Sequence, residues 1–229
     1  MTTRFPNGIS NAARGSDLED MGQLDPTAYH TYFNDFDEAP LATEWTLTAV
    51  SVGTGTSAIT TPDTDGGMAL ITSAANENDG LWAQLKGETF LLESGKKTWM
   101  KARFNTSDAI QSDMVVGLHS TSTTPQAATM RFLFETVDGA AAMYFNNDNN
   151  TTDSDSSTVI TLTDGTFVTV GCYYDGVSTI KLYANDVHIT TMTGITVPAA
   201  EMAVGFGAIN GSASAETYNF DYIMVAKER

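Results

Sequence analysis

Residues 167–190 read FVTVGCYYDGVSTIKLYANDVHIT, and this stretch decides the fold class. It holds three segments rich in β-branched and aromatic residues, separated by Asp175-Gly176 and Asn185-Asp186. Pairs of Asp, Asn and Gly favour the tight turns that join antiparallel strands. The stretch therefore predicts three strands in hairpins, the second hairpin joining residues 180–183 to residues 187–189.

The same pattern of short strand-forming segments extends over most of the chain. Residues 98–104 alternate with a period of two, which places Trp99, Lys101 and Arg103 on one face of a strand. Strands recur about every dozen residues, as in β-sandwiches, and no long window has helical periodicity. The fold class predicted is all-β, with two antiparallel sheets packed as a sandwich. The strands are expected at residues 45–50, 68–72, 81–85, 98–104, 114–119, 130–135, 141–145, 159–162, 167–174, 179–183, 187–191, 203–209 and 218–226.

The composition excludes several classes of protein. The chain has 229 residues, with 28 acidic and 11 basic side chains and a formal net charge of −17. The electrostatic field of so acidic a chain repels polyanions, so no nucleic-acid partner is predicted. The apolar runs are far shorter than the roughly 18 residues that span a bilayer, so no membrane partner is predicted either. A single cysteine, Cys172, excludes an intrachain disulfide framework and is expected to be a small core residue.

Residues 1–31 differ from the rest and are expected to form an extended N-terminal arm before a sandwich of residues 32–229. Breakers such as Asn7-Gly8 and Asp25-Pro26 interrupt the segment, and no apolar periodicity survives. Its apolar side chains need a surface, either the chain's own domain or a neighbouring subunit, and the sequence leaves both open. We expect the arm to be dispensable for the sandwich but required for incorporation or oligomerisation. The arm residues predicted to bind a partner are Phe5, Ile9, Leu18, Met21, Leu24 and Tyr29.

The order of the later segments resembles a known fold. A hairpin over residues 167–186 is followed by a glycine-bearing segment at 202–208 and a closing segment, FDYIMV, at 220–225. Residues 33–37, followed by Trp45, are similar to that fold's opening strand. Together they resemble the concanavalin A-like (laminin-G-like) jelly roll. The resemblance implies a two-sheet antiparallel jelly-roll sandwich with an extended N-terminal arm, and it carries no activity with it.

The beginning of the chain carries a second resemblance. The segments RFPNGI at 4–9, DPT at 25–27, HTYF at 30–33 and DFD at 35–37 are similar to the start of virion structural proteins of tailed marine phages. This resemblance implies a capsid decoration protein or another structural component, made in the host cytoplasm and placed on the capsid surface. The implied partners are the major capsid protein or other virion proteins, and further copies of the chain in a homo-oligomer.

Catalytic constellations are missing from the expected strands. Glycoside hydrolases of this fold use carboxylates that alternate along one strand as Glu-x-Asp-x-Glu, and no expected strand has that pattern. The histidines, His30, His119 and His188, are scattered and form no Ser-His-Asp set. We therefore predict no enzyme and no catalytic residue.

A metal site is the open chemical question. Concanavalin A-like domains often hold Ca²⁺ through Asp and Asn oxygens on loops, and residues 146–157 are expected to form such a loop. Asp148, Asp153 and Asp155 are the candidate calcium ligands, although their spacing does not fit an EF-hand. The alternative is a solvated loop without metal. No other cofactor is predicted.

One expected face is basic on an otherwise acidic chain. Lys97, Lys101 and Arg103 are predicted to form a partner-binding face, together with Trp99. The alternative function is a carbohydrate-binding module for host attachment, with Ca²⁺ as its possible cofactor. Such a module needs exposed aromatic side chains. Trp45, Trp82 and Trp99 lie inside expected strands, so core packing is the role predicted for each, with the basic face around Trp99 as the exception.

Overall fold

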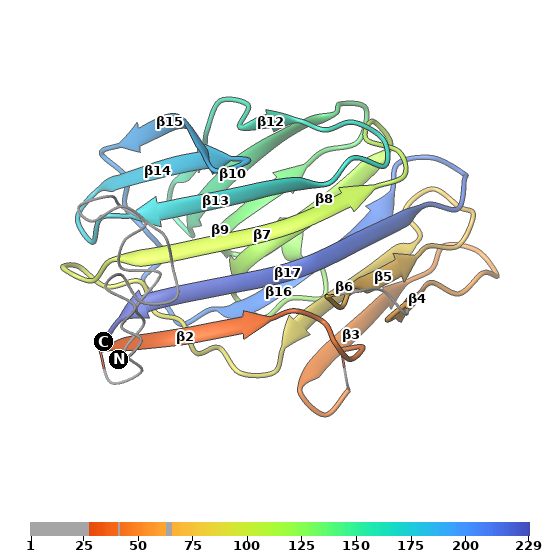
Figure 1. Ribbon diagram of the computed structural model, residues 1–229, viewed down its shortest axis with the longest axis horizontal. Helices are drawn as coiled ribbons and strands as arrows, with labels where there is room; N and C mark the ends of the chain where they lie inside the picture. Colours follow the sequence, from red (N-terminus) through yellow and green to blue (C-terminus); the bar gives the residue numbers. More distant parts are fainter. Residues whose placement is uncertain (1–27, 41, 63–65) are drawn as a thin grey trace, which may run out of the picture.

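The protein is a β-sandwich of two antiparallel sheets stacked face to face (Figure 1). The computed structural model describes residues 28–40, 42–62 and 66–229. Each sheet has eight strands, and we name the sheets after their central strands as the β17 sheet and the β16 sheet. The two-sheet antiparallel fold predicted from the sequence is confirmed.

The β17 sheet has the strand order β15-β14-β13-β7-β17-β5-β4, and β2 also pairs with β17. Its strands are β2 (Tyr29–Asn34), β4 (Ala58–Thr60), β5 (Ala69–Thr72), β7 (Thr98–Thr106), β13 (Val168–Tyr174), β14 (Thr179–Ala184), β15 (Val187–Thr193) and β17 (Thr217–Glu228). The β16 sheet has the order β11-β10-β9-β8-β16-β6-β3, and β12 pairs with β10. Its strands are β3 (Trp45–Val50), β6 (Gly80–Leu85), β8 (Ser112–His119), β9 (Met130–Thr136), β10 (Ala142–Asn149), β11 (Asp153–Asp155), β12 (Ile160–Thr161) and β16 (Ala203–Asn210).

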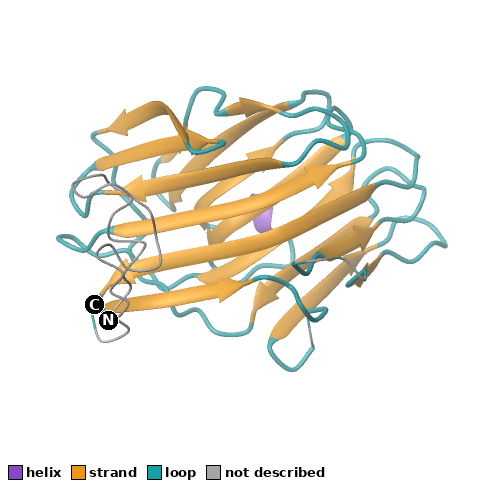
Figure 2. Ribbon diagram, viewed as in Figure 1, coloured by secondary structure: helices purple, strands orange, loops and turns teal. Residues whose placement is uncertain are grey.

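Helix is nearly absent from the described ranges. The helical element found there is one 3₁₀ turn, η2 (Pro125–Ala127), shown in purple in Figure 2. Accordingly, no helix within these ranges is long and apolar enough to cross a membrane.

The hairpins predicted between β13, β14 and β15 are present. Asp175 accepts hydrogen bonds from the backbone N–H groups of Val177, Ser178 and Thr179 at 2.8, 3.0 and 3.0 Å. At the second turn, Asn185 and Asp186 have φ values of 48° and 64°. Asn and Asp tolerate this left-handed conformation, which type I′ hairpin turns require at both central positions. The turn residues therefore fix the register of the three strands.

Two element boundaries differ from those expected. β2 begins at Tyr29 and pairs Tyr29 with Glu228, so the first strand begins three residues before the expected start of the sandwich at residue 32. The expected loop at residues 146–157 is largely a hairpin of β10 and β11. Asn149 accepts hydrogen bonds from the N–H groups of Thr151 and Thr152, and Asn150 takes a φ of 69°. The residues that suggested a loop thus build the turn of a hairpin.

The core between the sheets is aromatic at its centre. Phe220 of β17 contacts Phe206 of β16, with ring centroids 4.7 Å apart, so the pair joins the two sheets. Phe206 also packs on Trp45 and on Phe36, at 5.3 and 5.0 Å. Cys172 is buried among apolar neighbours, as expected.

Candidate functional site

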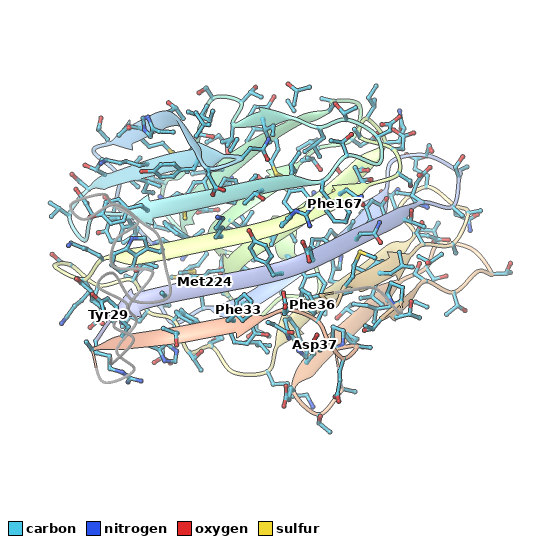
Figure 3. The ribbon with its side chains drawn as sticks, in the orientation of Figure 1. Tyr29, Phe33, Phe36, Asp37, Phe167 and Met224 are labelled. Carbon is cyan, nitrogen blue, oxygen red and sulfur yellow. The ribbon has the colours of Figure 1, made fainter. Side chains whose placement is uncertain are left out.

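The outer face of the β17 sheet is unusually aromatic. Its side chains alternate with core residues along β2, β7, β13, β14 and β17, and several are visible along these strands in Figure 3. Phe33, which lies 6.3 Å from Tyr222 between ring centroids, is 61% exposed. We call this surface the aromatic face. It consists of Tyr29, Phe33, Trp99, Phe167, Tyr173, Tyr183, Tyr222 and Met224.

The three cations predicted to bind a partner all lie on this face, but each is paired within the chain. Lys101 lies 2.5 Å from Asp186, and Arg103 pairs with Asp221. Lys97 lies 4.0 Å from Glu228. These pairs cancel the charges of the cations. The three cations that the sequence suggested as a basic face are therefore each paired with a carboxylate.

A hollow with a glycine floor interrupts the aromatic face. Gly171 on β13 forms part of its lining, together with Trp99, Tyr173 and Tyr183 from three strands. Trp99 contacts Tyr173 at 5.6 Å and Tyr29 at 5.9 Å, and it is only 1% exposed although it points outward. The hollow has a volume of only about 20 Å³, and Lys101, Thr169 and Asp186 line it beside the aromatic side chains.

The outer face of the β16 sheet is closed by its own side chains. Trp82 lies across Gly207, where an added Cβ would approach the indole ring to 2.8 Å. His119 lies across Gly205 in the same way, and a Cβ there would come within 2.0 Å of its Nε2 atom. Burial lowers the pKa of His119, which is fully enclosed. Trp82, Val115 and Leu133 form a second buried cluster on this face, so the middle of the sheet presents no open cleft.

β9 crosses this face without a catalytic carboxylate series. Its outward residues are Arg131, Leu133 and Glu135, which include a single carboxylate. Within the described ranges, no strand presents three carboxylates on one face.

The candidate calcium ligands surround an arginine. Arg131 lies 3.0 Å from Asp148 and 3.1 Å from Asp153, in each case from its Nη2 atom to a carboxylate oxygen. Asn146 donates from its Nδ2 atom to Asp153 and Asp155 at 2.8 and 2.7 Å. The structure therefore brings the three aspartates together, but a guanidinium and an amide already occupy them. Among the described residues, no group of three or more His, Cys, Asp or Glu side chains is arranged to hold a metal ion.

Glu135 completes this network, which we call the Arg131 network (Arg131, Glu135, Asn146, Asp148, Asp153 and Asp155). The pKa of Glu135 is raised to about 7, chiefly by burial; Arg131 acts to lower this pKa, and Asp155 and Asp153 act to raise it. Glu135 therefore carries a proton for much of the time near neutral pH.

A groove lies beside the Arg131 network, with a volume of about 380 Å³. Its polar lining comes mainly from the β10–β11 hairpin, including Asp148, Asn150 and Thr151, and from Arg131 of β9, whereas η2 adds only Ala127. The volume lies within the range of about 300–1,000 Å³ that is usual for small-molecule sites. The sequence analysis missed this groove because Arg131 and the turn are adjacent only through the pairing of β9 with β10.

The predicted arm residues fall into two groups. Phe5, Ile9, Leu18, Met21 and Leu24 lie outside the described residues. Tyr29 belongs to β2 and packs on Trp99, so it is part of the sandwich rather than of a separate arm.

Comparison with known proteins places the fold. No family model matches the chain, and no curated protein matches it. A protein of unknown function from Shewanella oneidensis MR-1 matches with a TM-score of 0.62 at 15% identity, over 96% of this chain and 97% of that one. An endo-1,3-β-glucanase from Streptomyces sioyaensis matches with a TM-score of 0.57 at 14% identity, over 90% and 98%. The carbohydrate recognition domain of Emp47p matches with a TM-score of 0.52 at 13% identity, over 89% and 98%. The chain thus has the concanavalin A-like jelly-roll fold that lectin domains and glucanases share.

Proposed function

We propose that the chain is a non-enzymatic structural protein of a phage virion, a capsid decoration protein that attaches through its N-terminal arm and its aromatic face. The observation that carries the proposal is the aromatic face. Stable protein interfaces are enriched in Tyr, Trp, Phe, Met and Arg and depleted in unpaired charge at their centres. The aromatic face has this composition, and its cations are already neutralised within the sheet.

The absence of enzymatic activity is supported by β9 and its surroundings. β9 presents Arg131, Leu133 and Glu135 on its outer face rather than a series of carboxylates, and Trp82 is buried in the same sheet. The outer face of the β16 sheet is covered by its own side chains, and charged residues on it form ion pairs with one another. Such a surface suits a domain that is displayed outward in many copies. The strongly acidic charge keeps such crowded copies soluble and mutually repelling, except at the contact.

Deletion of residues 1–27 is expected to abolish co-sedimentation with capsids of the encoding phage while the sandwich stays folded. The cut falls before Ala28 because β2 begins at Tyr29. The physical reason is that the arm's apolar side chains supply contact area that the face alone lacks. Co-sedimentation of the truncated and full-length chains with capsids measures this loss. Circular dichroism verifies that the strands are still formed. Full decoration of capsids by the folded, truncated chain would contradict the proposal.

Carbohydrate binding is a second candidate function, favoured by the groove at the Arg131 network. Its carboxylates, amide and threonine hydroxyls are suited to hydrogen bonds with the hydroxyls of a saccharide. The carbohydrate recognition domain of Emp47p and the glucanase share the fold, which adds support to this candidate.

This candidate predicts that soluble polysaccharides retain the chain in a pull-down. Replacement of Asn150 and Thr151 with alanine, in the groove, should weaken retention at least tenfold, whereas Tyr222→Ala on the opposite sheet should not. The same pull-down is repeated in the presence of EDTA. Loss of retention would show that binding depends on Ca²⁺, for which Asp148, Asp153 and Asp155 are the candidate ligands. Equal retention of the unchanged chain, the alanine variant at Asn150 and Thr151, and Tyr222→Ala would show that the groove does not bind the polysaccharide.

A further inference from the structure

We propose that β15 (Val187–Thr193) pairs antiparallel with β15 of a second copy of the chain, so that two β17 sheets join into one continuous sheet. The proposal concerns an edge of the sheet rather than its faces. It deepens the proposed function by assigning the surface through which two copies meet, and only its consequence for a capsid rests on that function.

Along β15, one side of the backbone is open to a further strand. Within the described ranges β15 pairs with β14 on one side and with no strand on the other, and it forms a border of the sheet in Figure 1. In an antiparallel ladder alternate residues direct their N–H and C=O groups away from the partner strand, so this border offers donors and acceptors. Five of the seven residues of β15 are β-branched, which favours the extended conformation that a second strand needs.

β15 lacks the features that commonly protect an edge strand, which are charged side chains, proline and short length. Residues 187–200 contain no Asp, Glu, Lys or Arg, although 17% of the whole chain is charged. Pro198 of this segment comes only after the strand has ended. A bulge in the pairing with β14 leaves residues 190–193 in regular register. Val187 and Ile189 are 62% and 44% exposed, so the edge is also apolar.

The other described edge strands are less suited to pairing. β4, β11 and β12 have only two or three residues. β2 and β3 both border a pocket of about 420 Å³ whose lining includes Asp35, Asp37, Glu38 and Glu44. Two copies that met there would bring these carboxylates together, and like charges repel. β15 is therefore the edge at which a second strand meets the least resistance.

The net charge of −17 makes most approaches between two copies repulsive. The segment after β15 contacts β10, because Thr196 accepts hydrogen bonds from Asn147 and Asn149, so the β10–β11 hairpin lies on the same side of the sandwich. The carboxylates of β11 are already bound within the chain, Asp153 to Arg131 and Asp155 to an amide. An uncharged strand beside neutralised carboxylates thus gives two acidic copies a place to meet.

Symmetry determines where the aromatic faces point in such a pair. Antiparallel pairing of two identical edge strands requires a two-fold axis perpendicular to the sheet, and because each copy has one β15, assembly closes at the dimer. The axis leaves the outer faces of both β17 sheets on the same side. Under the proposed function both aromatic faces then meet one capsid, and the second contact is favoured because the first has already brought it close.

Size-exclusion chromatography with light scattering tests the pairing in the full-length chain at about 1–100 μM, which brackets the weak association expected of so small an interface. The unchanged chain should approach about 49 kDa, twice the 24.5 kDa of one copy. Ile189→Lys should weaken dimerisation by about tenfold or more, because the two-fold axis places both added lysines in the interface. Thr191→Lys, at another exposed position of β15, should have the same effect. Circular dichroism verifies that both variants are folded.

Val52→Lys is the matched control, because Val52 is 68% exposed, lies outside β15 and undergoes the same change of charge. It should leave the dimer unchanged. Hydrogen exchange locates the contact, since the amides of residues 187–193 should exchange more slowly as the concentration of the unchanged chain rises, but not in Ile189→Lys.

A chain that stays monomeric over the whole range would overturn the proposal. A dimer that Ile189→Lys and Thr191→Lys leave intact would also overturn it, as would equal weakening by Val52→Lys. These measurements use no capsid, so their failure leaves the proposed function standing. Conversely, a dimer that does not co-sediment with capsids rejects the proposed function and leaves the pairing of β15 in place.

Discussion

Phe220→Ala is expected to lower the free energy of unfolding by about 3–5 kcal/mol. Phe220 is fully buried at the centre of β17, where its ring contacts Phe206 of the opposite sheet at 4.7 Å and Phe104 of its own sheet at 5.9 Å. Truncation leaves a cavity between two sheets whose backbones are fixed by hydrogen bonds, so the site collapses only in part. The loss is large against the total stability of a typical domain, about 5–15 kcal/mol.

Chemical denaturation followed by tryptophan fluorescence measures this loss. Phe33→Ala is the matched control, because Phe33 is the same residue type, lies in the same sheet and is 61% exposed. Its replacement should change the free energy of unfolding by less than about 0.5 kcal/mol. Equal losses in the two variants would show that the sheets do not meet at Phe220.

Arg131→Met is expected to cost about 3 kcal/mol at pH 8, because it leaves carboxylates of the Arg131 network without their cation. The Arg131 side chain is 12% exposed, and Asp148 and Glu135 beside it are also largely buried. Asp153 is half exposed and contributes less, which places the expected loss at the lower end for a buried pair.

The cost of Arg131→Met should depend on pH. Arg131 lowers the pKa of Glu135, which burial holds at about 7, so removal of the guanidinium raises that pKa further. The folded variant then binds more protons than the unfolded chain, and its stability falls as the pH rises from about 5 to 8. Denaturation of both proteins at pH 5 and pH 8 should therefore give the larger difference at pH 8.

Arg103→Met is the control for this series. Arg103 also forms an ion pair, with Asp221, but its side chain is 40% exposed and solvent screens the pair. Its replacement should cost less than about 1 kcal/mol, with little change between the two pH values. A loss from Arg131→Met as small as this would show that the Arg131 network contributes no more than surface pairs do.

Local patterns were sufficient to predict most of the fold. The period-two alternation of residues 98–104 and the Asn185-Asp186 turn predicted β7 and the β14–β15 hairpin, because both signals depend on neighbouring residues. The patterns missed β2, half of which lay in the expected arm, and also β4 and β11, which have only three residues each. A strand of three residues is too short to show a period, and pairing with a longer neighbour holds it in place.

The candidate site was harder to predict, since its charges meet only through strand pairing. Asp148 and Asp153 looked like metal ligands because each is a carboxylate near a turn. Their cation, Arg131, belongs to a different strand and enters the network through the pairing of Arg131 with Asp148 across β9 and β10. In the same way, the sequence placed Lys101 and Arg103 on one face but did not reveal that Asp186 and Asp221 neutralise them.

The position of the two chain ends has a consequence for engineering. Ala28 and Arg229 are hydrogen-bonded at one end of the β17 sheet, where β2 begins and β17 ends in Figure 1. A peptide fused to the C-terminus would therefore emerge beside the arm, on the side that faces the capsid under the proposed function. The loop of residues 211–216 joins β16 to β17 at the opposite end of a strand that spans roughly 40 Å. A cargo inserted in that loop would lie at the end of β17 far from the arm, and a circular permutant opened there would carry its new ends at that edge of the sandwich.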